Sequence, residues 1–207
     1  MPTCPNFIAN TFAHLLGGLL ITGISTESPF INDLDKKPIT SLFVFLAVLF
    51  LSYIIINSQK SLYKYVLFII FCVLFGQILV SITNRLKMKG QLNEILFDVA
   101  LIFVSMTLIG FFDNQNLISW QNYLFGMLFI LTLSFIASAL FSSKKEKKNT
   151  HLWLSRLFVV LFAIFIAFDV EILKENAKIC KSPDYINESL NLYLDIVNLF
   201  SGLGGSE

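Results

Sequence analysis

The chain has few charged residues and no excess of either sign. Of its 207 residues only 14% are Asp, Glu, Lys or Arg, and the formal net charge is +1. Proteins that bind nucleic acid through their surface usually carry a clear basic excess. The near-neutral balance therefore excludes nucleic acid as an expected partner.

Cysteine is also scarce. The three cysteines, Cys4, Cys72 and Cys180, form no CxxC motif and have no histidine at ligand spacing. Such an odd and scattered set indicates neither a disulfide framework nor a metal centre. Residues 1–7 contain no Lys or Arg, and no small-residue cleavage site follows the first apolar run. We therefore expect the first helix to be retained rather than removed as a signal peptide.

Apolar residues dominate what remains. Hydrophobic residues make up 56% of the chain, including 22 Phe, and the mean hydropathy is +0.74. A water-soluble domain cannot bury this much apolar surface, so the protein is expected to reside in a lipid bilayer. Runs of about 20 apolar residues predict membrane-spanning helices. Seven runs occur, at residues 7–25, 39–57, 63–83, 95–112, 118–141, 152–172 and 186–204.

These runs predict an all-α fold: a polytopic seven-helix transmembrane bundle that forms a single domain over residues 1–207, with a short and polar seventh helix. The seventh run either spans the membrane, which we favour, or forms a re-entrant helix shielded by the others. Residues 85–90, 144–148 and 174–183 carry charge or turn signals and are predicted as linkers. For seven spans, nine Lys and Arg lie on the side of the C-terminus and five on the other, if Lys64 at the start of the third run is counted with the loop before it and Arg156 is left inside the sixth run. The C-terminus is therefore expected to be cytosolic.

Two aspartates provide the strongest clue to function. Asp169 ends the apolar part of the sixth run, and Asp195 lies within the seventh. A carboxylate at bilayer depth costs several kcal/mol unless it is protonated, paired or in contact with water, so packing alone does not explain it. The two helices are joined by a short loop and should run antiparallel, which places both aspartates in the same half of the membrane. Two adjacent carboxyls share a proton and respond to pH, and in ionised form they suit Ca²⁺.

The C-terminal third resembles a known family. Residues 167–171 read AFDVE, residues 184–186 read DYI, and residues 190–200 read LNLYLDIVNLF. These segments are similar to the C-terminal signature of the transmembrane Bax-inhibitor-motif family, and the last of them matches most closely. The resemblance implies a seven-helix fold that acts as a pH-sensitive Ca²⁺ leak channel of intracellular or bacterial membranes. Several members suppress apoptosis, and some large DNA viruses carry copies.

The resemblance implies a paired-aspartate latch between Asp169 and Asp195, with Ca²⁺ or protons as the ions concerned. Two features depart from the family. Phe168 and Val170 replace the usual neighbours of the first aspartate, and residues 39–57 contain no counterpart of the membrane-embedded arginine found in some relatives. Arg156 could substitute for that arginine, but it lies about 20 Å from Asp169 along the same helix.

Other polar residues are weaker candidates for pore or supporting roles. Asn191 and Asn198 share a helical face with Asp195. Glu171 lies just beyond Asp169, and Asp98 is as compatible with an interfacial position as with a pore. His14 could titrate, but a neutral imidazole hydrogen-bonded to a neighbouring helix is the favoured interpretation.

Three classes of function remain open. The first is the Ca²⁺ leak channel or regulator of ion homeostasis, with an anti-apoptotic role, in an endoplasmic-reticulum-like, Golgi-like or viral inner membrane. The second is a non-conducting scaffold that binds membrane-protein partners in a cell membrane or a viral envelope. The third, an intramembrane enzyme, is disfavoured because neither HExxH nor GxSxG is present. We expect no enzymatic activity and no cofactor.

Overall fold

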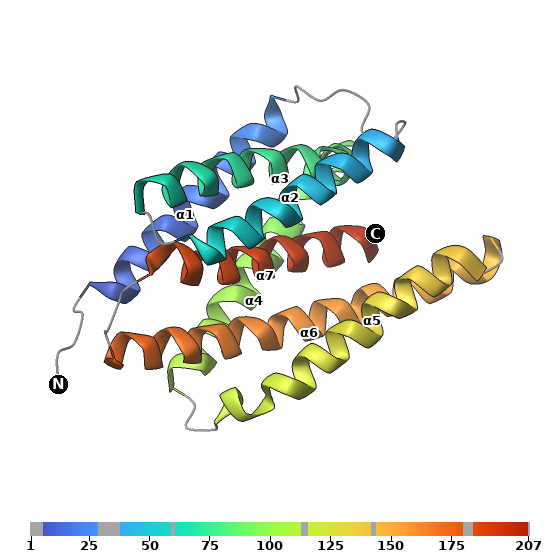
Figure 1. Cartoon of the computed structure of the whole chain (residues 1–207). Coiled ribbons are helices and arrows are strands. Elements are labelled where there is room, and N and C mark those ends of the chain that lie inside the picture. The colour runs from blue at the N-terminus through green and yellow to red at the C-terminus, as the bar shows by residue number, and fades with distance from the viewer. Residues whose placement is uncertain are drawn as a thin grey trace. The chain divides into compact units, whose positions relative to one another are not determined.

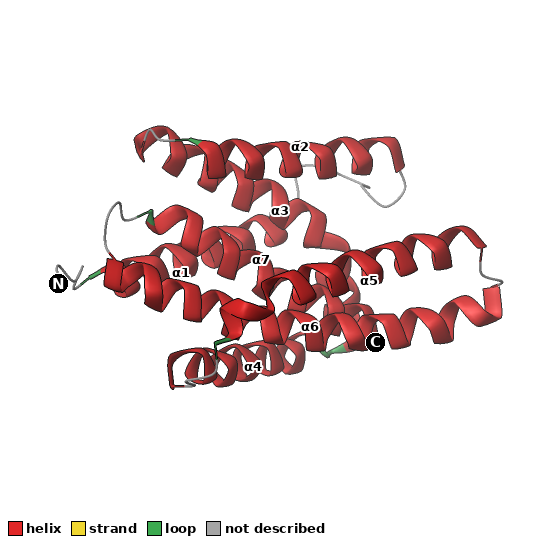
Figure 2. Ribbon diagram, turned by 60° about the horizontal axis from the view of Figure 1, so that its bottom comes forward, coloured by secondary structure: helices red, strands yellow, loops and turns green. Residues whose placement is uncertain are grey.

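A computed structural model describes residues 6–28, 38–58, 61–112, 116–141, 144–179 and 184–206. Within these ranges the chain forms seven α-helices and one short 3-10 helix, and no strand (Figure 2). The helices are α1 (Phe7–Glu27), α2 (Pro38–Asn57), α3 (Ser61–Lys89), α4 (Leu92–Phe112), η2 (Leu117–Trp120), α5 (Gln121–Phe141), α6 (Lys144–Ile179) and α7 (Tyr185–Ser206). The predicted all-α fold of seven helices is confirmed.

Three predicted linkers are wrong in part, because helices continue through charged sequence. Residues 85–89 belong to α3, and only two residues, Gly90 with a φ of 71° and Gln91, separate α3 from α4. Residues 144–148 are the first turns of α6, which also continues through Lys174 to Ile179. Lys and Glu are good helix formers, so charge marks where a helix leaves the apolar layer and not where it ends.

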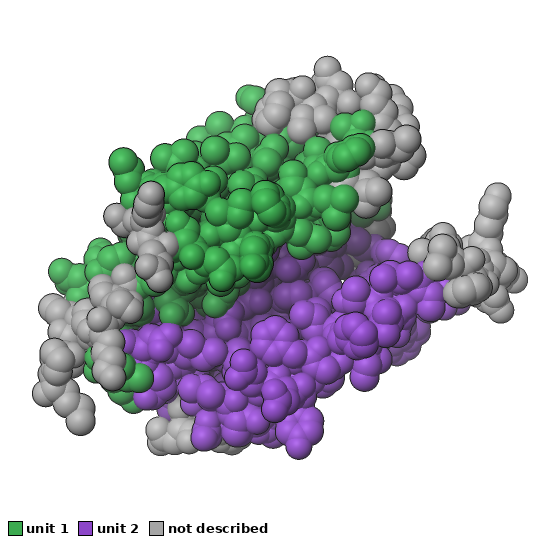
Figure 3. All heavy atoms as spheres, viewed as in Figure 1, with its two compact units in different colours: residues 1–89, 177–193 green, residues 90–176, 194–207 purple. Residues whose placement is uncertain are grey.

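The chain divides into two compact units, coloured separately in Figure 3. Unit 1 comprises residues 1–89 and 177–193. In it α3 packs along both α1 and α2 (Figure 1). Close helix contact is made at Gly18, where an added Cβ would lie 2.9 Å from the Phe68 ring, and at Gly76, where it would lie 2.8 Å from the Thr22 carbonyl oxygen. Glycine at these points allows α1 and α3 to approach closely.

Unit 2 comprises residues 90–176 and 194–207. Within it α5 and α6 lie side by side (Figures 1 and 2). Aromatic rings join them: the centroids of Phe125 and Phe165 are 5.5 Å apart, and those of Phe135 and Phe158 are 5.7 Å apart. The helix α7 contributes its first nine residues to unit 1 and the remainder to unit 2.

Apolar side chains cover the outside of several helices. On α4, exposed apolar residues recur at intervals of three or four, as expected for one continuous helical face. They are Phe97, Leu101, Val104, Leu108 and Phe112. Four described segments are long and apolar enough to cross a membrane, at Phe7–Glu27, Leu62–Lys89, Leu92–Phe112 and Leu117–Ser138. An integral membrane protein with lipid-facing helices accounts for these surfaces.

Cys72 is a buried free thiol on α3. Cys4 and Cys180 lie outside the described residues.

Candidate functional site

Asp169 lies in the C-terminal third of α6, in a stretch where the helix packs closely. Its neighbours Phe168 and Val170 are buried, whereas Asp169 itself is half-buried. On α4, Gly110 packs against this stretch: a Cβ added there would lie 2.5 Å from the Ala167 carbonyl oxygen and 2.9 Å from the Val170 Cβ. The residues on both sides of Asp169 are thus fixed by a direct backbone contact with α4, and the aspartate is placed accordingly.

Asp195 lies on the part of α7 that belongs to unit 2 and is only 5% exposed. Its side chain is hydrogen-bonded to that of Asp169. The structure thus brings together the two aspartates that the sequence singled out, and we call them the carboxyl pair. Ionised carboxylates can only accept hydrogen bonds, so a bond between two of them requires one to carry a proton. Such a bond forms when the two carboxyl groups share one proton.

One carboxyl oxygen of the pair has no hydrogen-bond donor among the described residues. Asp195 Oδ2 is buried and accepts no hydrogen bond from any described residue. An unsatisfied carboxylate oxygen in a low-dielectric setting attracts a proton or a cation. No group of three or more His, Cys, Asp or Glu side chains that could hold a metal ion occurs among the described residues. Ca²⁺ takes six to eight oxygen ligands, so two carboxyls alone make an incomplete site.

A second glycine lets α7 approach α6 within unit 2. A Cβ added at Gly202 would lie 2.9 Å from Val159 Cγ2 and 3.6 Å from the Ser155 carbonyl oxygen. Gly202 follows Asp195 by two turns of α7. The contact fixes α7 against α6 on the C-terminal side of the carboxyl pair, as Gly110 fixes α4 against α6 beside Asp169.

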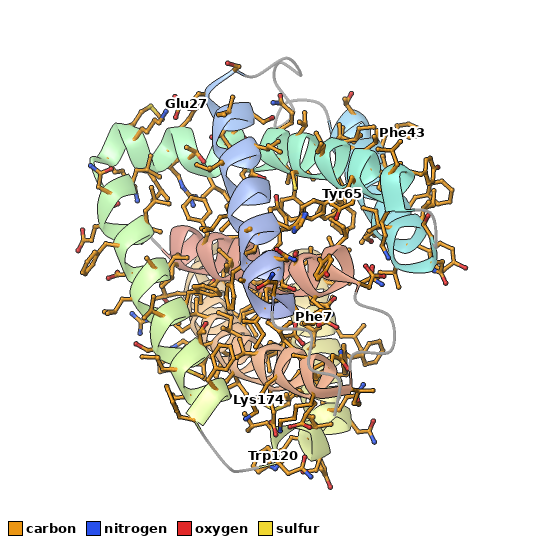
Figure 4. The ribbon with its side chains drawn as sticks, turned by 90° about the vertical axis from the view of Figure 1, so that its left-hand side faces the viewer. Phe7, Glu27, Phe43, Tyr65, Trp120 and Lys174 are labelled. Carbon is orange, nitrogen blue, oxygen red and sulfur yellow. The ribbon has the colours of Figure 1, made fainter. Side chains whose placement is uncertain are left out.

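Glu171 does not form part of the pair's hydrogen bond. It is buried, and its Oε2 accepts a bond of 2.8 Å from the backbone N–H of Leu117, at the start of η2. One turn further along α6, Lys174 donates bonds of 3.2 and 3.3 Å to the carbonyl oxygens of Gly110 and Phe111, in the last turn of α4. Figure 4 labels Lys174 and, on η2, Trp120. The two charges attach α6 to the end of α4 and to the start of η2, and they satisfy backbone groups at these helix ends.

The remaining polar candidates lie in varied surroundings. Asn191 is exposed, whereas Asp195 one turn later is buried. The residues of the predicted polar face of α7 therefore differ in their exposure to solvent. Asn198 and Asp98 are half-buried in unit 2. Arg156 is exposed, and its guanidinium carbon lies 5.8 Å from the centroid of the Trp153 ring. That contact gives no support to Arg156 as the partner of the aspartates.

His14 belongs to unit 1 and has aromatic neighbours. Its Nδ1 lies 2.6 Å from the Asn10 carbonyl oxygen, and because a carbonyl only accepts, Nδ1 is the donor. The ring lies 5.2 Å from Tyr65 and is stacked at 6.1 Å on Tyr185. The sequence predicted that His14 forms a hydrogen bond to a neighbouring helix, and this is wrong: the acceptor lies in the preceding turn of α1. The neighbouring helices α3 and α7 contact His14 through the aromatic rings of Tyr65 and Tyr185.

Two buried polar groupings were missed in the sequence. Lys64 is only 3% exposed and donates a hydrogen bond to the carboxylate of Asp184. Asp184 also accepts a bond of 3.1 Å from the backbone N–H of Asn187, which makes it the N-cap of α7. A lysine at the start of an apolar run, and an aspartate directly before a helix, were the available signals.

The second grouping surrounds Tyr193, which is completely buried among the rings of Phe68, Phe71 and Phe75. Its hydroxyl lies 2.6 Å from Thr22 Oγ1, which also bonds backbone carbonyl oxygens of α1 and α3. Because those carbonyls accept the threonine proton, Tyr193 donates to Thr22. Tyr193 therefore attaches α7 to α1 and α3.

The chain as a whole matches one known family. A family model described as "Inhibitor of apoptosis-promoting Bax1" matches residues 4–203, nearly the whole chain. The match covers α1 to α6 and α7 as far as residue 203, and it includes both aspartates of the carboxyl pair. The chain is therefore a Bax-inhibitor-type integral membrane protein and belongs to the Bax1 inhibitor family.

Proposed function

We propose that this protein is a pH-regulated Ca²⁺ leak channel whose gate is the carboxyl pair. The observation that carries the proposal is the hydrogen bond between Asp169 on α6 and Asp195 on α7, together with the unbonded Oδ2 of Asp195. In the protonated state this bond holds the two helices together. Loss of the shared proton leaves two like charges in contact, which repel and favour a second helix packing.

The number of oxygen ligands in the carboxyl pair supports transient passage of Ca²⁺ rather than tight binding. Two ionised carboxylates offer four oxygens, fewer than the six to eight that Ca²⁺ prefers, and water would have to supply the rest. Conduction requires binding that is favourable enough to admit an ion and weak enough to release it. We therefore assign Ca²⁺ to the pair as a permeant ion and the proton as its regulator.

The name of the matched family suggests a biological setting for this activity. We propose that the protein acts in an intracellular membrane of the endoplasmic-reticulum or Golgi type, or in a viral inner membrane, and there inhibits apoptosis through ion homeostasis. We propose no enzymatic step, because the carboxyl pair needs only to bind and release protons and cations in this role.

Ca²⁺ flux from liposomes that contain the purified protein tests the proposal. Flux is measured at about pH 6 and about pH 8, a range in which a proton shared by two carboxyls can be released. The wild type should leak Ca²⁺ faster at the higher pH. Asp169→Asn and Asp195→Asn keep the shape and hydrogen-bonding capacity of the pair, but should abolish the difference between the two pH values.

Glu94→Gln is the matched control, since it neutralises an exposed carboxylate in the first turn of α4. It should leak with the pH dependence of the wild type. A folded wild type without flux at either pH would refute the channel and favour a membrane scaffold that acts through protein partners.

A further inference from the structure

Arg156 lies where α6 enters its uncharged part. The helix has 36 residues, about 54 Å at the helical rise, and therefore exceeds the hydrocarbon layer of about 30 Å. Residues 157–168, which separate Arg156 from Asp169, carry no charge. Arg156 is therefore the last charged residue before the apolar part of α6, counted from the end that begins at Lys144.

The side chain of Arg156 faces outward on an apolar surface. Trp153 is 65% exposed, and Leu157 and Val160 are also exposed. These residues are three or four positions apart, so they lie on one face of α6 together with Arg156. We call this face, formed by Trp153, Arg156, Leu157 and Val160, the Arg156 surface. Its apolar side chains can contact lipid acyl chains favourably, whereas the charge of Arg156 cannot.

No acidic side chain of the described residues forms an ion pair with this charge. The ion pairs among the described residues include Lys64 with Asp184 and Lys87 with Glu27. Arg156 instead lies over the Trp153 ring. An arginine stays protonated in proteins, and beside hydrocarbon it requires an anionic partner. A guanidinium matches the two oxygens of a phosphate, while an indole ring is favourable at the level of lipid headgroups.

We infer that the Arg156 surface is a binding site for one anionic phospholipid, whose phosphate is held by Arg156 and whose first acyl carbons lie along Leu157 and Val160. Charge complementarity favours an anionic over a zwitterionic lipid. The first five residues of α6 include four lysines and one glutamate, in the turns that precede Arg156. This excess of positive charge attracts a headgroup with net negative charge. The inference is independent of the proposed channel activity.

Tryptophan fluorescence can test the site directly, because the chain has only two tryptophans, Trp120 and Trp153. In a Trp120→Phe background, Trp153 becomes the sole reporter. The protein is placed in phosphatidylcholine vesicles with a minor fraction of a brominated lipid, which quenches a neighbouring indole. Brominated phosphatidylglycerol should occupy the site in preference to brominated phosphatidylcholine by about fivefold.

Arg156→Gln in the same background should reduce the preference to about one, while Arg156→Lys should keep part of it, because an ammonium binds phosphate without the bidentate geometry. The Arg156 side chain is exposed, and an unchanged thermal midpoint will verify that the variant is folded. Trp120, studied alone in a Trp153→Phe background, is the matched control and should be quenched in proportion to the bulk lipid. Inorganic phosphate should not compete.

Equal quenching of Trp153 by both brominated lipids would overturn the inference. A second outcome would also overturn it: the preference for phosphatidylglycerol persists in Arg156→Gln and disappears only at high salt. That result would assign the lipid selectivity to the long-range electrostatic attraction of the lysines. Should Arg156→Gln fail to fold, Arg156→Lys with an undiminished preference for phosphatidylglycerol would exclude the bidentate site.

Discussion

Lys64 on α3 and Asp184 directly before α7 form an ion pair in which the lysine is almost completely buried and the aspartate also caps a helix. The same ammonium donates to the Ser58 carbonyl oxygen at 3.3 Å. Asn187, in the first turn of α7, donates to the Ile56 carbonyl oxygen at 3.4 Å. The end of α2, the start of α3 and the start of α7 are thus joined by polar contacts within unit 1.

Loss of this ion pair should destabilise the protein measurably. Asp184→Asn keeps a good N-cap but leaves Lys64 without its carboxylate, and we expect a loss of about 1–3 kcal/mol in the free energy of unfolding. Asp184→Ala should lose about 1 kcal/mol more, because the cap is removed as well. Denaturant unfolding in detergent micelles measures both values.

The controls for this prediction are Lys87→Met and a double substitution. Lys87 and Glu27 form an exposed pair, so Lys87→Met should cost less than about 1 kcal/mol. Lys64→Met combined with Asp184→Asn should recover part of the stability lost in Asp184→Asn, since no buried cation is left unpaired. Equal losses for the Lys64 and Lys87 pairs would show that burial does not strengthen the former.

Tyr193→Phe should weaken the attachment of α7 to α1 and α3. The ring remains among Phe68, Phe71 and Phe75, but the bond to Thr22 disappears. We expect the free energy of unfolding to fall by about 1–2 kcal/mol. Tyr53→Phe removes a hydroxyl from an exposed tyrosine and should change it by less than about 0.5 kcal/mol. Identical unfolding curves for the two variants would contradict the prediction.

Gly110→Ala should be harmful and Gly126→Ala should not. The methyl group at position 110 would meet the Ala167 carbonyl oxygen at 2.5 Å, whereas nothing lies within 4 Å of the corresponding position at Gly126. Separation of α4 from α6 should destabilise the protein by about 1–3 kcal/mol. In α5 the change should be neutral or stabilising by up to about 1 kcal/mol, since alanine favours helix. Thermal unfolding of the two variants gives the comparison, and a stable Gly110→Ala would disprove the close contact.

The two aspartates should act as a unit in the flux assay. If one shared proton regulates the leak, either substitution to asparagine removes the pH response, and the double substitution has no further effect on that response. The change in leak rate between the two pH values is the quantity compared in the four proteins. Additive effects would show that Asp169 and Asp195 titrate independently, and the latch would then be refuted.

Much of the fold follows from the sequence. Apolar runs of bilayer length predict the number, order and approximate position of the helices, because every backbone group in a membrane must be hydrogen-bonded within its own helix. Helix ends were predicted less well. The run of lysines at residues 144–148 and the charges at 174–178 mark where α6 leaves the apolar layer, and the helix itself continues beyond both.

The candidate site was also predicted only in part from the sequence. Asp169 and Asp195 could be identified from the sequence because a carboxyl in an apolar run is costly, and the costly residue is visible without coordinates. Their hydrogen bond required the packing of α6 and α7 within unit 2. Glu171 shows the limit most clearly, since it lies two residues from Asp169 in sequence and binds the start of η2 instead.

Sequence by itself thus determined the class of the protein, its helices and its two unusual acids, which depend on local composition and on the cost of placing charge in lipid. Only the tertiary structure decided which polar groups meet: Lys64 with Asp184, Tyr193 with Thr22, and Gly110 with the backbone of α6. These contacts join helices far apart in the chain, and each depends on helix rotation and close packing that no single segment specifies.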